Sequence, residues 1–159
     1  MTTVDELFGT WMLTRWDFTV DAVPRGYPMG NDAQGQIIYG TDGHMSAILM
    51  MRDRPRSEAP QFHQASPEER DRASLGFISY GGAWELRGNL VVHHVAFALF
   101  PNWIGTDLVR EVSWDGANLV LTAQPEVSRS GKTVVNRLFW RRAVAVSETA
   151  ERRAFQESR

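Results

Sequence analysis

Apolar and polar residues alternate along most of the chain, which is the pattern of β-strands with one buried face. Aromatic and β-branched residues fill these stretches, and short runs containing Gly, Pro, Asn or Asp separate them. The pattern predicts about eight strands, at residues 8–20, 35–39, 44–51, 77–87, 90–100, 106–114, 118–123 and 133–142. Because a meander of this size closes into a barrel without exposed edges, we expect an all-β, antiparallel up-and-down barrel.

Two stretches depart from the strand pattern. Ser66, followed by Pro67 and by Glu69, predicts the start of one inserted helix that ends at about Ser74 or Gly76. Residues 146–159 look helical but have few apolar positions, which predicts a marginal, partly solvated tail. We therefore expect a barrel domain at residues 1–145 and a helical or partly disordered tail at residues 146–159.

The predicted hairpin turns indicate which side chains face the barrel interior. A two-residue turn at 88–89 pairs Trp84 with His93 and Tyr80 with Phe97. These four side chains then share the more apolar face, which we place inside. His94 points to the opposite face because neighbouring strand residues alternate.

Other hairpins give a less complete prediction. A turn at 115–116 pairs Arg110 with Leu121 and leaves this arginine among apolar side chains. A four-residue turn near 41–42 pairs Tyr39 with His44, but both faces are largely apolar and the inward one stays open. Arg15 is in phase with Trp11 and Leu13, and its direction is open as well.

Composition excludes several classes of function. The formal net charge is −2, so no basic excess points to nucleic acid. The chain has no cysteine, which excludes disulfides and thiolate chemistry. No apolar run reaches the length of a membrane span and no secretory signal begins the chain, so we expect a cytoplasmic protein. We also expect it to be a monomer or a homodimer.

The motifs resemble those of the lipocalin-like domain family of bacterial and fungal proteins. The resemblance rests on Gly9-Thr10-Trp11 and on segments at 39–47, 54–56, 77–85, 93–95, 99–106 and 138–142. It implies a calycin-type barrel around a small ligand, with Trp11 at the closed end under Arg141 or Arg142. His44 and Trp84 stand where the family pattern has Tyr. Some members lie near secondary-metabolite genes, which implies hydrophobic metabolites as ligands.

Three residues are candidate catalytic groups: His93 and Tyr80 for proton transfer, and Arg110 for a developing negative charge. A buried, hydrogen-bonded histidine and an arginine reaching solvent are the structural alternatives. Trp103, in a loop between two long strands, is a candidate lid or a plug of the core. We predict further ligand contacts from Tyr39, His44, Trp84, Phe97, Met50 and Arg15.

The residues support two functional hypotheses and a weaker third. The first is a binding module that holds one small hydrophobic molecule in the barrel. The second is a cofactor-free cyclase or isomerase that acts in the same cavity on a polyketide- or terpene-like substrate. The third is a packed barrel without a cavity. No metal site is predicted, since His93 and His94 point apart, and no phosphate-binding loop predicts a nucleotide cofactor.

Overall fold

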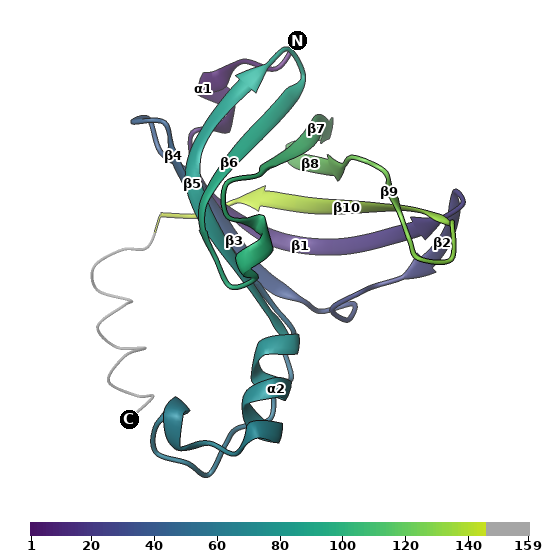
Figure 1. Cartoon of the computed structure of the whole chain (residues 1–159). Helices are drawn as coiled ribbons and strands as arrows, with labels where there is room; N and C mark the ends of the chain where they lie inside the picture. The colour runs from purple at the N-terminus through teal and green to yellow at the C-terminus, as the bar shows by residue number, and fades with distance from the viewer. Residues whose placement is uncertain (146–159) are drawn as a thin grey trace.

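The computed structural model describes residues 1–145, which form a closed antiparallel barrel (Figure 1). Its eight strands follow one another in sequence order, and the pairing of the first with the last closes the barrel. The strands are β1 (Gly9–Val20), β3 (Gln34–Tyr39), β4 (His44–Met50), β5 (Phe77–Arg87), β6 (Leu90–Ala98), β7 (Asp107–Asp115), β8 (Asn118–Ala123) and β10 (Thr133–Arg142). The predicted all-β barrel is confirmed, while the predicted helical tail lies outside the described residues.

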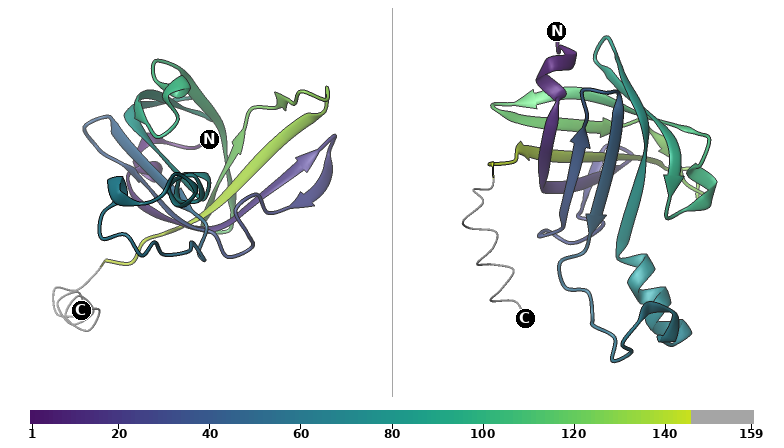
Figure 2. Two further views of the ribbon diagram at one scale, coloured as in Figure 1. Left: turned by 60° about the horizontal axis from the view of Figure 1, so that its bottom comes forward. Right: turned by 90° about the vertical axis from the view of Figure 1, so that its left-hand side faces the viewer.

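Two short strands widen one side of the barrel. β2 (Val23–Gly26) pairs with the end of β1, and β9 (Glu126–Val127) pairs with the start of β10. β1 pairs with β3 only from Gly9 to Met12, and beyond that point it continues with β10 alone and then with β2. Residues 16–26 and 126–136 thus project from the barrel, and we call them the β1–β10 extension (Figure 2).

Trp11 closes the end of the barrel next to the short helix α1 (Val4–Leu7). Its side chain is 1% exposed, and its indole nitrogen donates to the Leu7 carbonyl oxygen at 2.9 Å. The Arg142 guanidinium lies 4.1 Å from the Trp11 ring and donates to the carbonyl oxygens of Phe8 and Glu6. Of the two arginines proposed from the sequence, Arg142 is therefore the partner of Trp11.

The hairpin of β5 and β6 contains a bulge that the sequence did not reveal. Trp84 pairs with His93 as expected, but the register shifts at Gly81 and Gly82, so that Tyr80 pairs with Ala98. Ala96 is the extra residue, and it reverses the alternation of the strand beyond it. Phe97 consequently points outward with 66% of its surface exposed, and the prediction that it faces the interior is wrong.

Two other hairpins differ from the expected register. Tyr39 pairs with Met45 rather than with His44. The reason is that Gly40 bonds to His44, so the turn consists of the three residues 41–43. Arg110 pairs with Ala123 rather than with Leu121. The two-residue turn lies at 116–117 instead of 115–116, because Asp115 pairs with Asn118. The second shift spans two residues, so the inward face of that hairpin is the one expected.

The predicted inserted helix is α2 (Pro67–Leu75), and it stands apart from the barrel between β4 and β5 (Figure 1). Ser66 accepts from the Glu69 backbone nitrogen and Glu69 accepts from that of Ser66, which completes the expected capping box. A 3₁₀ turn, η1 (Phe62–Gln64), precedes the helix. Within residues 1–145, no helix has the length and apolar character that crossing a membrane requires.

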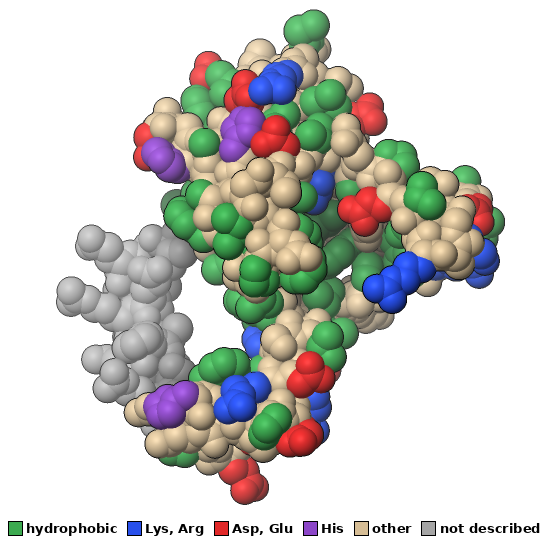
Figure 3. Space-filling view, in the orientation of Figure 1, with side chains coloured by type: hydrophobic (Ala, Val, Ile, Leu, Met, Phe, Trp, Pro, Cys, Tyr) green, Lys and Arg blue, Asp and Glu red, His purple; other side chains and the backbone are tan. Residues whose placement is uncertain are grey.

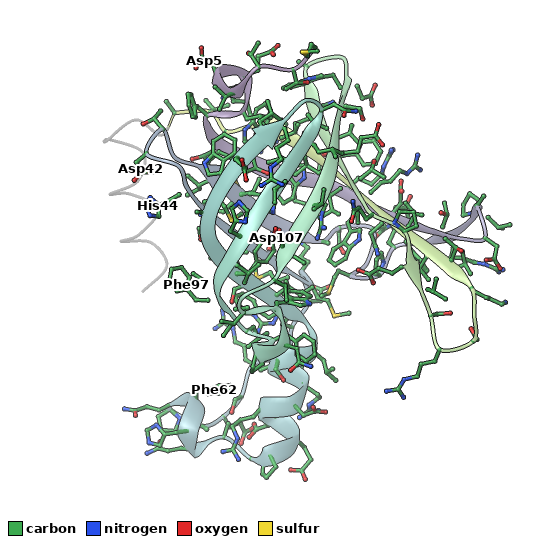
Figure 4. The ribbon with its side chains drawn as sticks, turned by 45° about the horizontal axis from the view of Figure 1, so that its top comes forward. Asp5, Asp42, His44, Phe62, Phe97 and Asp107 are labelled. Carbon is green, nitrogen blue, oxygen red and sulfur yellow. The ribbon has the colours of Figure 1, made fainter. Side chains whose placement is uncertain are left out.

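His94 makes an ion-pair cluster on the outer face of the barrel. Its two ring nitrogens lie 2.7 Å from Asp107, which Figure 4 labels, and 2.9 Å from Glu85. The hydrogen bonds to Asp107 and Glu85 raise the pKa of His94 above its ordinary value of 6.5. A raised pKa in the folded state stabilises the fold at low pH, and this contribution is lost as the pH rises through the folded pKa.

We expect His94→Gln to lower the free energy of unfolding more at pH 5.5 than at pH 8.5. The difference should be less than about 1 kcal/mol, because this side chain is partly exposed and solvent screens its partners. Urea denaturation at the two pH values measures it. Asp107→Asn should reduce the same pH dependence, and an equal loss at both pH values would contradict a charged His94.

Candidate functional site

A cavity of about 180 Å³ opens between the barrel and the β1–β10 extension. Figure 3 shows a hollow at this place, with hydrophobic side chains on its walls. Ile37, Leu49, Ile78, Leu121, Ala123, Leu138 and Trp140 form most of the apolar wall. The cavity exists because β1 pairs with β3 only as far as Met12. Beyond that point the β1–β10 extension lies over the barrel interior and leaves a space beneath it.

A bulge in β1 brings Trp16 to the cavity. Leu13 pairs with Trp140 and Arg15 pairs with Phe139, so Thr14 is an extra residue that reverses the alternation of the strand. Trp16 then faces inward, where its indole nitrogen donates to the side-chain oxygen of Asn136 at 2.9 Å.

Two of the predicted polar residues line the cavity from strands on either side of β6. Tyr80 comes from β5 and Arg110 from β7. One Arg110 nitrogen donates to the Val109 carbonyl oxygen at 2.9 Å, and no carboxylate within residues 1–145 forms an ion pair with it. The cavity therefore holds a cation that can attract an acceptor oxygen of a ligand.

His93 is buried between two tyrosines and does not line the cavity. Its Nε2 lies 2.8 Å from the Tyr39 hydroxyl, and its Nδ1 lies 3.1 Å from the Tyr80 hydroxyl. Only 1% of its surface is exposed. Of the three residues in this chain of hydrogen bonds, Tyr80 alone is among those that line the cavity.

Burial determines the protonation states of His93, Tyr80 and Tyr39. Removal from solvent, together with the Arg110 and His94 charges, lowers the pKa of His93 to about 3. Burial raises the pKa of Tyr80, against the opposing effect of Arg110, and raises that of Tyr39 well above its usual value. All three groups are therefore neutral near pH 7.

Trp103 lies on the 3₁₀ turn η2 (Pro101–Trp103) and also lines the cavity. Its ring meets Tyr80 edge-on with a centroid separation of 5.9 Å, and it meets Phe100 in the same way at 5.8 Å. These edge-on contacts fix the position of the Trp103 ring relative to Tyr80 and Phe100.

The model of the lipocalin-like domain family matches residues 8–143 of the chain. The protein belongs to this family. The match covers all eight strands of the barrel, so the family resemblance of the sequence motifs is confirmed.

A relative of this lipocalin-like protein is the 4'-hydroxy-3'-methoxypropiophenone carrier protein ppsC of Aspergillus oryzae. The two are 30% identical over 106 residues, which cover 62% of this chain and 96% of the relative. A solved lipocalin-like protein from Bacteroides uniformis is also similar, with 14% identity and a TM-score of 0.45. That similarity covers 87% of this chain and 99% of the solved one.

Several residues predicted to contact a ligand lie elsewhere in this lipocalin-like barrel. His44 is on the outer surface beside Asp42, and Phe97 points away from the barrel (Figure 4). Arg15 is outside as well, over the Phe139 ring, because the bulge at Thr14 reverses its direction. Met50 lines a separate outer hollow with Arg52. None of these four residues lines the cavity: the inward direction predicted for Phe97 is wrong, and His44 and Arg15, whose direction was open, face outward.

Tyr39 and Trp84 are in the core rather than at the cavity wall. Trp84 is 6% exposed, donates to the Gly40 carbonyl oxygen and packs against Tyr39 at a ring separation of 4.6 Å. Tyr39 is 1% exposed and reaches the cavity only through His93 and Tyr80. Their predicted direct contact with a ligand is therefore not available in this arrangement.

The sequence analysis missed other residues of the cavity wall. Trp16 and Trp140 are not among the predicted site residues, and Glu126 falls between two predicted strands. Asn136 gives a usable signal, because it alternates with the apolar residues Val134, Leu138 and Trp140, and an amide on such a face needs a hydrogen-bond partner. Within residues 1–145, no group of three His, Asp or Glu side chains is placed to hold a metal ion.

Proposed function

We propose that the protein binds one small, mostly hydrophobic molecule in the cavity between the barrel and the β1–β10 extension. The observation that carries the proposal is an apolar cavity with few polar groups at its wall, which is the usual form of a ligand site. A dry cavity of roughly 150 Å³ can hold benzene. At about 180 Å³, this one suits a single ring with short substituents.

The relative from Aspergillus oryzae supports a carrier. Its name gives an aryl ketone as cargo, and the shared region covers 96% of that protein. A single ring with a short ketone chain also matches the size and the polar residues of the cavity described above. We therefore propose an aromatic metabolite as the cargo of this protein, delivered or stored in the cytoplasm.

Binding is favoured over the alternative of a cofactor-free cyclase or isomerase. A catalytic base has to reach the proton that it removes, and His93 does not line the cavity. Tyr80 does line it, but its raised pKa makes it a poor base near neutral pH. Arg110 and Tyr80 are better suited to orient a bound polar group than to move its protons.

Titration with 4'-hydroxy-3'-methoxypropiophenone tests the proposal. Trp16, Trp103 and Trp140 line the cavity, so occupation should change the intrinsic fluorescence, and we expect saturation at one molecule per chain. The recovered compound should be unchanged by mass spectrometry and chromatography. Conversion into an isomer would instead support an enzyme.

A cavity-filling variant locates the binding site. Ala123 is buried at the cavity wall, so Ala123→Phe should place a ring in the cavity and weaken binding at least about tenfold. Phe97→Ala changes an exposed side chain on the outer face and should leave the affinity unchanged. Equal affinity for native protein and Ala123→Phe, with both folded by circular dichroism, would reject this cavity as the site.

A further inference from the structure

The hydroxyl of Tyr39 sets the direction of the buried hydrogen bonds. Tyr39 is 1% exposed, and His93 Nε2 is the one hydrogen-bond partner of its hydroxyl within the described chain. A buried hydroxyl donates its proton to whatever acceptor it can reach, so Tyr39 donates to Nε2. Nε2 must then be the unprotonated nitrogen of the ring.

The neutral His93 ring consequently carries its proton on Nδ1. This nitrogen lies 3.1 Å from the Tyr80 hydroxyl, so His93 donates and the Tyr80 oxygen accepts. The low pKa of His93, about 3, agrees with a ring that has a single proton. The opposite order would leave the Tyr39 proton buried without an acceptor.

The proton of Tyr80 has to point elsewhere. Its oxygen already accepts from His93, and no second protein acceptor for the hydroxyl exists among residues 1–145. Because Tyr80 lines the cavity, a ligand held there is the acceptor left for its O–H bond. The hydrogen-bond chain from Tyr39 through His93 thus presents a donor there.

Arg110 supplies further donors at the same cavity. Trp140 lines the cavity with its ring, while its indole nitrogen is itself buried and has no hydrogen-bond partner within the part of the chain that the structure describes. The Arg110 guanidinium retains donors beyond the one bound to the Val109 carbonyl. The side-chain acceptors at the wall are Asn136, which already accepts from Trp16, and Glu126, which is exposed to solvent.

We infer that the cavity selects molecules that carry an acceptor oxygen, such as an aryl ketone, and that Tyr80 donates the hydrogen bond that recognises it. The inference rests on the proposed binding function and specifies its ligand chemistry. Tyr39 and His93 are positioning residues, which fix the Tyr80 proton without touching the ligand. Arg110 adds positive charge near the same oxygen.

Two probes of nearly equal shape test the inference. Propiophenone carries a ketone oxygen, while propylbenzene has the same carbon skeleton without it. We expect the native protein to bind propiophenone about tenfold more tightly, which is the value of one hydrogen bond. Tyr80→Phe should abolish that preference by weakening propiophenone alone. Equal binding of both probes by the native protein would overturn the inference and leave the proposed function intact.

Other outcomes separate the two proposals. If Tyr80→Phe weakens both probes equally, Tyr80 acts by packing and the inference is wrong. If neither probe nor 4'-hydroxy-3'-methoxypropiophenone binds the native protein, the proposed function itself fails.

The proton order has its own readout. Proton–nitrogen correlation spectra of the histidine rings in the native protein should show His93 protonated on Nδ1, with assignment by comparison with a His93→Gln sample. Protonation on Nε2 would reverse the direction of both hydrogen bonds of His93 and overturn the inference.

Discussion

Acidification from pH 6.5 to pH 4.5 is expected to lower the free energy of unfolding by roughly 2–3 kcal/mol through His93 alone. The folded chain holds this ring neutral, with a pKa lowered from 6.5 to about 3, because it is buried between two tyrosines. The unfolded chain binds a proton in that window and the folded chain does not. Stability due to this group is therefore complete above pH 6.5 and is lost as the pH falls toward 3.

Urea denaturation of the native protein and of His93→Gln between pH 7 and pH 4.5 measures this effect. The variant should be less stable at pH 7, because Tyr39 and Tyr80 lose their partner, but its stability should fall less steeply with acid. His63→Gln, which changes an exposed side chain on η1, should keep the slope of the native protein. Parallel slopes for native protein and His93→Gln would show that His93 is protonated alike in both states.

The second large effect is expected at Gly82. A Cβ atom at this position would overlap the His94 carbonyl oxygen and lie 2.8 Å from the Ala96 backbone nitrogen. Both atoms belong to the bulged segment of β6, which cannot move away without breaking the pairing with β5. Gly82→Ala should therefore cost about 3 kcal/mol or more of folding free energy.

Thermal unfolding followed by circular dichroism measures this cost, as a fall in the midpoint of about 6–12 °C for a domain of this size. Gly76→Ala is the matched control, because its φ is −90° and its nearest neighbour is the flexible side chain of Met51, at 3.3 Å. A Gly82→Ala protein as stable as the Gly76→Ala protein would mean that β5 and β6 do not approach each other this closely.

The barrel strands could be predicted from the sequence, but the two bulges in them could not. Alternation located all eight barrel strands, since each has one buried face. It could not locate the extra residues Thr14 and Ala96, because a bulge leaves no fixed mark in a single sequence. Each extra residue reverses the strand beyond it, so Phe97 was assigned to the wrong face and the direction of Arg15 could not be decided.

Three residues of the site could be predicted from the sequence. Tyr80, Arg110 and Trp103 were selected as polar or aromatic residues in unusual surroundings, and all three line the cavity. Trp16 was missed because the bulge at Thr14 reverses β1, and Glu126 was missed because β9 is too short to show a period of its own. The place where β1 leaves β3 has no signature in the sequence either.

The central claim is that the cavity between the barrel and the β1–β10 extension holds the ligand. A crystal structure of the protein with bound 4'-hydroxy-3'-methoxypropiophenone tests it most directly. The aromatic ring should lie between Trp16, Trp103 and Leu121, with the ketone oxygen about 2.7 Å from the Tyr80 hydroxyl oxygen. A molecule bound instead in the outer hollow beside Met50, or against Phe97 on the outer face, with the cavity empty, would contradict it.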